Sequence, residues 1–324
     1  MMHAFSTCMG SLMGHPWAKK LQKRVQKLVT AMRASHLPNR LLSDIAARMG
    51  IKRMLITSNK TRFTSVHASI ESVARLQPAL QELACCHAAS LTAKAYQLIS
   101  DDMFFIKLKQ LCKLLEPFTL VIMAVQANHS TLADVMRYWL FLARSVNALP
   151  KDSIDPDFRS HCFTAYNLRH IEMVSPLCKL ALFLHPLYRS AVPTNALQWK
   201  ELRSTAGTFW QNRHHGKSEL TQLMSTDLEK YRLGDAPYSN LPVDGDLGTL
   251  QLWWRGLLAD HPHIQLPLLA LVLLDIKPHA ADPEKTFSLM GWFHSARRSR
   301  MLSRTTTNLT MIKMHHTNTM DRYA

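Results

Sequence analysis

The chain has 324 residues, of which 47% are hydrophobic and 19% are charged, and its formal net charge is +16. That composition can bury a core and argues against intrinsic disorder. The six cysteines show no CxxC or zinc-finger spacing, which favours a reduced, intracellular protein over a disulfide scaffold. The amino-terminal residues show no signal-peptide cleavage site. The longest apolar run, Ile264 to Ile276, is too short to span a bilayer, so we expect a soluble protein.

Positive charge is concentrated at the two ends of the sequence. Residues 1–60 carry eleven Lys/Arg and one acid, and residues 285–324 carry seven and one. The middle, 61–284, carries 21 of each sign. Basic patches attract polyanions, of which nucleic acid is the commonest, but they can also be solvated helix faces without a partner. The charge pattern leaves both interpretations open.

Apolar spacing and the scarcity of glycine predict a mainly α-helical protein. An amphipathic helix with a basic exterior begins near Trp17 and is expected to stop at Pro38, and a short helix follows over 40–49. Residues 52–58 predict a short strand. The next helix carries apolar residues at helical spacing, namely Ile70, Val73, Leu76, Leu80 and Leu83.

Further helices are predicted along the rest of the chain, at 89–99, 103–125, 130–147, 157–187, 195–213 and 216–231. Residues 233–247 are rich in Pro, Asp and Gly and are typical of a linker. After it, a helix begins at Leu250, a second covers 265–275, and a last one begins near Asp282, where Pro283 suits the first helical turn.

Five short blocks, in order, resemble the hAT superfamily of cut-and-paste DNA transposases. They are His15-Pro16-Trp17 with the basic helix and Ser35-His36, Thr61-Arg62-Phe63-Thr64-Ser65, Leu114-Leu115-Glu116-Pro117 with Ser130-Thr131-Leu132-Ala133-Asp134-Val135, Ala181-Leu182-Phe183-Leu184-His185-Pro186-Leu187-Tyr188, and the segment from Trp253-Trp254 through Glu284-Lys285-Thr286-Phe287-Ser288 to Asn308-Leu309. Phe63 stands where the family usually has tryptophan, His185 where it has aspartate, and Lys285 where it has arginine. The last block resembles the family's carboxy-terminal dimerisation region.

The resemblance implies an organisation for the whole chain. Residues 1–88 would be the remnant of an incomplete RNase H-like core, 89–232 a large all-helical insertion, 233–247 a linker, 248–314 the dimerisation region and 315–324 a tail. It also implies a nuclear protein. No membrane partner and no small-molecule substrate are expected.

In this family three acidic residues hold two divalent metal ions. One ion activates the attacking oxygen, and the other stabilises the leaving oxygen. The third acid corresponds to Glu284, and the first two are expected before Met1. One glutamate cannot hold two metals, so we expect no cleavage by this chain alone. No cofactor is expected, although a complete transposase would use Mg or Mn. For Glu284 we favour the alternative interpretation, a carboxylate at a helix start that faces the helix dipole, over a working metal ligand.

The resemblance also suggests interaction residues. Self-association is expected through apolar side chains of the dimerisation region, namely Trp253, Trp254, Leu257, Leu268, Leu271 and Phe287. DNA phosphates are expected to contact the basic residues Lys19, Lys20, Lys23, Arg24, Lys27, Arg297, Arg298 and Arg300.

Three functions remain open from the sequence. The first is a transposase-derived, catalytically incomplete protein that self-associates and binds nucleic acid nonspecifically. The second is a truncated reading frame of an active metal-dependent transposase. The third is a helical scaffold without a DNA role.

Overall fold

The computed structural model describes residues 2–58, 63–127, 129–150, 155–192, 195–216, 218–279, 281–293 and 302–320, and these contain helices and no strand. The prediction of a mainly α-helical protein is confirmed. Among the described residues, none of the helices combines the length and apolar character that crossing a bilayer requires. The chain divides into two compact units, residues 1–278 and 279–324.

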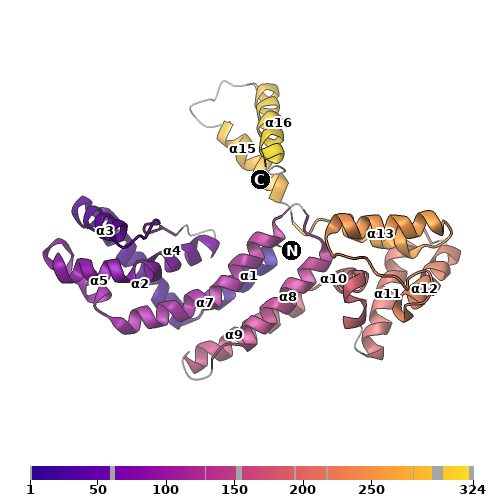
Figure 1. The fold of residues 1–324 in the computed structure, drawn as a ribbon, viewed down its shortest axis with the longest axis horizontal. Helices are drawn as coiled ribbons and strands as arrows, with labels where there is room; N and C mark the ends of the chain where they lie inside the picture. Colours follow the sequence, from indigo (N-terminus) through magenta and orange to yellow (C-terminus); the bar gives the residue numbers. More distant parts are fainter. Residues whose placement is uncertain are drawn as a thin grey trace. The chain divides into compact units, whose positions relative to one another are not determined.

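The first half of the first unit is organised around one long helix, α7. Its elements are α1 (Met2–Met13), α2 (Pro16–Ala34), α3 (His36–Arg48), α4 (Phe63–Arg75), α5 (Gln77–Cys86), the 3-10 turn η1 (Ala88–Ser90), α6 (Ala93–Ile99) and α7 (Asp102–Val125). The Asp101 side chain caps α7 by accepting a hydrogen bond from the Phe104 amide. α7 packs against α1, α2, α4 and α8, so it joins the two halves of the unit (Figure 1).

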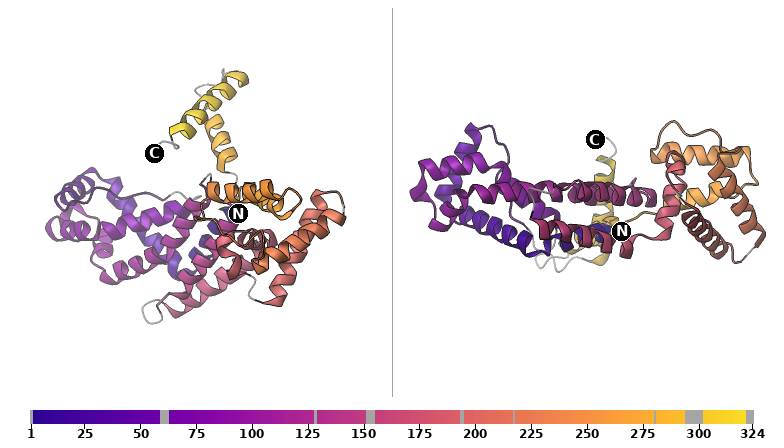
Figure 2. Two further views of the ribbon diagram at one scale, coloured as in Figure 1. Left: turned by 45° about the vertical axis from the view of Figure 1, so that its right-hand side comes forward. Right: turned by 90° about the horizontal axis from the view of Figure 1, so that it is seen from below.

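The second half follows with shorter helices. They are α8 (Leu132–Asn147), α9 (Pro156–Met173), α10 (Pro176–Phe183), the 3-10 helix η2 (Pro186–Ala191), α11 (Ala196–Arg213), α12 (Ser218–Leu233), α13 (Leu247–Asp260) and α14 (Leu266–Asp275). α10 packs against both α8 and α11, and α14 packs against α8, α10, α12 and α13. Helices α11 to α14 gather at the end of the unit away from α3 and α5 (Figure 2).

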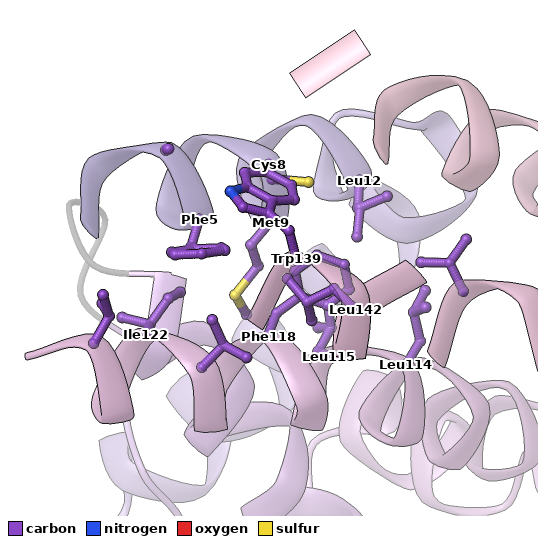
Figure 3. Packing of buried hydrophobic residues seen from close by; sticks show 14 of the residues in the cluster. Phe5, Cys8, Met9, Leu12, Leu114, Leu115, Phe118, Ile122, Trp139 and Leu142 are labelled. Carbon is purple, nitrogen blue, oxygen red and sulfur yellow. The ribbon is translucent and has the colours of Figure 1, made fainter. Parts of the chain in front are cut away.

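The core of the first unit joins segments that are far apart in sequence. Phe5 of α1 lies 4.8 Å from the fully buried Trp139 of α8, measured between ring centroids. The Tyr166 hydroxyl of α9 donates a 2.7 Å hydrogen bond to the Trp139 carbonyl. Figure 3 shows Phe5 and Met9 of α1 beside Trp139 of α8 and Phe118 of α7. Burial of this apolar surface supplies the main stabilising term.

The second unit contains a helical hairpin, α15 (Ala281–Phe293) and α16 (Ser303–Met320). The two helices pack against each other. Phe293, Thr306 and Thr310 are buried. The Thr306 hydroxyl donates to the carbonyl of Leu302, the residue before α16, and the Thr310 hydroxyl donates to the Thr306 carbonyl.

Several predicted elements need correction. The strand predicted at 52–58 is wrong: the segment is not in a sheet, and the Ile56 amide donates to the Ser72 side chain of α4 at 3.1 Å. The helix predicted through Ile70 and Leu83 divides at Leu76, because Pro78 occupies the first turn of a new helix, α5. The helix predicted over 157–187 likewise divides into α9, α10 and η2.

Two boundaries near the amino end also differ. The basic helix ends at Ala34, and Pro38 lies buried in the first turn of α3 instead of ending α2. A proline in a first turn loses no helical hydrogen bond, so it is compatible with that position. Helix α1 was not predicted, although its buried residues recur at helical spacing opposite its polar ones; the buried set is Ala4, Phe5, Cys8, Met9, Leu12 and Met13.

Candidate nucleic-acid interface

Helix α2 is fixed by its start and by one apolar face. The His15 ring nitrogen Nδ1 accepts a 3.3 Å hydrogen bond from the Trp17 amide, and Pro16 occupies the first turn. The Trp17 ring stacks on Phe158 of α9 at 4.5 Å. The buried residues of α2 recur at helical spacing, namely Ala18, Leu21, Val25, Leu28, Val29 and Met32. The opposite face must therefore point outward.

That outward face is basic. Its exposed cations, spaced to lie along one side of the helix, are Lys19, Lys20, Lys23, Lys27 and Arg33. Helix α2 contains no acidic residue. From Lys19 to Arg33 the row spans about 21 Å, the length of about six base-pair steps. We call these five residues the basic face of α2. They can contact a row of phosphates, because lysine presents a flexible point charge that suits the backbone.

Arg24 has a different role from its neighbours. Its guanidinium forms a salt bridge with Asp101, at the start of α7, and lies 4.6 Å above the Phe104 ring. The hydrogen bond from Arg24 is the main reason that the pKa of Asp101 lies below its usual range. Arg24 was predicted to contact nucleic acid, but the structure places it in the junction between α2 and α7.

The extended segment 52–58 adjoins the basic face, which sequence reasoning did not foresee. The Arg33 guanidinium donates to the Thr57 hydroxyl at 2.5 Å, and the Gln26 amide donates to the Ser58 hydroxyl at 3.4 Å. Lys52 and Arg53 of this segment are exposed. Only the high positive charge of residues 1–60 hinted at this surface.

The two tryptophans predicted for dimerisation belong to the core of their own unit. Trp254 is fully buried, and its ring lies 5.5 Å from Tyr231 and 6.3 Å from Tyr238. Trp253 is half-buried and donates its indole N–H to the Asn240 carbonyl at 3.1 Å. Trp254 therefore has no surface to offer a partner in this conformation, because its own chain covers it.

The other predicted dimerisation residues differ in exposure. Leu257, Leu268 and Leu271 are partly buried and pack against the core of the first unit. Phe287, on α15 of the second unit, is 71% exposed. Of the six residues, Phe287 is the one with most of its side chain accessible.

The structure does not describe the side chains of the remaining predicted site residues. Glu284 lies within α15, but its side chain is outside the described residues, and so are Arg297, Arg298 and Arg300. In the part of the chain that the structure describes, no three His, Cys, Asp or Glu side chains form a group that could hold a metal ion.

Comparison with known proteins does not assign a family. No family model matches the chain, and a search of curated proteins finds no match either.

Proposed function

We propose that this chain is a transposase-derived, catalytically incomplete protein that binds nucleic acid nonspecifically through the basic face of α2. The observation that carries the proposal is a row of five exposed cations on a helix without a single acid. The sequence resemblance supplies the ancestry, including an origin of residues 1–88 in an RNase H-like core and action in the nucleus. Neither metal nor other cofactor takes part.

The expected binding is electrostatic. Each phosphate contact releases condensed counterions from duplex DNA, so affinity falls with salt at a slope of about −0.9 per contact. Five contacts would give a slope of about −4.5, and the dissociation constant at physiological salt would lie at about 10⁻⁴ to 10⁻⁶ M, as is typical of nonspecific binding. Sequence preference should be small, because phosphate contacts carry no base information.

A matched pair of triple variants tests the site. One replaces Lys19, Lys23 and Lys27 with glutamine. The other replaces Lys107, Lys109 and Lys113, which are exposed on α7, and so removes the same charge from a different helix. Anisotropy of a labelled duplex, titrated at several salt concentrations, should show a slope smaller by about 2.7 for the α2 variant. The α7 variant should stay close to the parent.

Equal losses in the two variants would contradict the proposal. They would show that net charge, and not the basic face of α2, determines binding. Absence of binding by the parent chain at low salt would favour the scaffold function instead.

A second candidate function, self-association, is favoured by the exposure of Phe287 and Trp292 on α15, 71% and 60% respectively. Large exposed aromatic side chains commonly mark interaction sites. Light scattering on full-length Phe287→Glu should show a smaller species than the parent. Leu197→Glu, which changes a 77% exposed leucine on α11, outside 248–314, is the control. A monomeric parent would end this candidate.

A further inference from the structure

A groove lies along α10, with α8 and α11 as its walls. α10 packs against both of these helices, so it forms the floor between them. The groove has a volume of about 610 Å³. Side chains from α8, α10, η2 and α11 line it, with His170 from α9 at one end. It is separate from the basic face of α2 and shares no residue with it.

The wall from α8 presents a row at helical spacing. Leu140 and Phe141 face the groove and are 46% and 45% exposed, with Arg137 one turn before and Arg144 one turn after. Leu182 of the floor and Leu202 of the opposite wall extend the apolar surface. Leu140 and Phe141 adjoin this floor, so the four side chains form one apolar surface within the groove.

The rim of the groove is positively charged. Arg137 is paired with Asp134 at 2.9 Å, and Lys179 with Glu201 at 2.9 Å. Arg144 is exposed and forms no ion pair with any described residue. Arg137 and Lys179 are thus neutralised within the chain, and Arg144 leaves one excess positive charge at the rim. A ligand that brings carboxylates to this rim would gain charge-assisted hydrogen bonds.

We propose that this groove binds one amphipathic helix of an acidic partner protein. Such a helix would place its apolar side chains against Leu140 and Phe141 and its carboxylates near Arg144. The distance from Arg137 to Arg144 is about 10 Å, two helical turns, which sets the length of the contact. A second copy of this chain is the poorer complement, because its formal net charge is also +16.

The test uses the full chain and two synthetic peptides. The acidic probe is a labelled helical peptide of about 14 residues with leucines at every third or fourth position and glutamates beside them. The basic probe has lysine in place of each glutamate. Fluorescence anisotropy should show at least about tenfold tighter binding of the acidic probe. Leu140→Glu and Arg144→Glu should each weaken its binding by about tenfold.

Two control variants keep the same chemical changes away from the groove. Leu120→Glu alters a 53% exposed leucine on α7, and Arg213→Glu alters an exposed arginine at the end of α11. Each should change the affinity by less than about twofold. A photoreactive group at the centre of the acidic probe should attach within 136–144 or 198–202.

Three results would overturn the proposal. They are equal affinity for the acidic and basic probes, unchanged binding by the groove variants, and attachment elsewhere. Displacement of the bound probe by single-stranded DNA would also overturn it, since the groove would then be a nucleic-acid contact.

Discussion

At the scale of single residues, Trp254 shows how an aromatic that resembles an interface residue can belong to a core. It packs with Tyr231 and Tyr238 and is fully buried. Trp254→Ala should lower the free energy of unfolding by about 3–5 kcal/mol, because it leaves a cavity. Leu252→Ala, two residues away and 70% exposed, should change it by less than about 0.5 kcal/mol. Urea unfolding measures both. Similar values would show that Trp254 is not a core residue.

Substitutions of the neighbouring residues Lys23 and Arg24 should affect different properties, DNA binding for Lys23 and stability for Arg24. Lys23→Gln should reduce the salt slope of DNA binding by about 0.9 and leave stability unchanged. Arg24→Gln removes the salt bridge to Asp101 and the contact with Phe104, so it should lower the urea midpoint and leave the slope unchanged. Anisotropy and urea titrations on both variants separate the two effects. A smaller slope for Arg24→Gln would show that this arginine also contacts DNA.

At the scale of elements, two helical glycines should respond differently to alanine. Open space surrounds the position of a Cβ at Gly207 in α11, so Gly207→Ala should stabilise the protein by about 0.5–1 kcal/mol. At Gly10 in α1 a Cβ would lie 2.7 Å from the Phe63 ring, which must then move. Gly10→Ala should therefore gain less or destabilise. Thermal unfolding compares the two, and an equal gain would mean that Phe63 moves at little cost.

Some helices could be predicted from the sequence, and other segments could not. Helices with an apolar and a polar face, such as α2 and α7, were predicted because the 3.6-residue period is visible in them. The residues 52–58 mimic a strand, but strand pairing depends on a distant partner that the sequence does not reveal. The divisions before α5 and before α10 coincide with Pro78 and Pro176, which periodicity alone overlooked.

The candidate sites were predicted unevenly for a related reason. The basic face of α2 lies on one helix, so a local pattern is enough to find it. The separate position of Arg24 depends on Asp101, 77 residues away, and the groove depends on helices from three parts of the chain. Neither could be read from spacing.

At the scale of the whole molecule, the buried His67 and His185 and the partly buried His170 should make stability depend on pH. Burial is the main cause that lowers the pKa of His67, His170 and His185. Between their folded pKa values and about 6.5, the unfolded chain binds more protons than the native one. Stability should thus be complete above about pH 6.5 and fall as pH decreases below it.

Urea midpoints at pH 7.5, 6.5 and 5.5 would measure this dependence. His67→Gln should make the decline shallower, and His129→Gln, at an exposed position, should leave it as in the parent. A midpoint that does not change over this range would contradict the assignment of buried, neutral imidazoles.

The packing of α1 has a consequence for synthesis on the ribosome. The His161 ring bonds the Ser11 carbonyl at 2.8 Å, and Arg169 donates to the Ser11 hydroxyl at 3.1 Å, across 150 and 158 residues. At about 5–20 residues per second, roughly 8–30 s pass before α9 is available to α1. During that interval the face of α1 that packs against α9 lacks this cover. The nascent chain is therefore a natural client for a chaperone that binds apolar helices as they emerge.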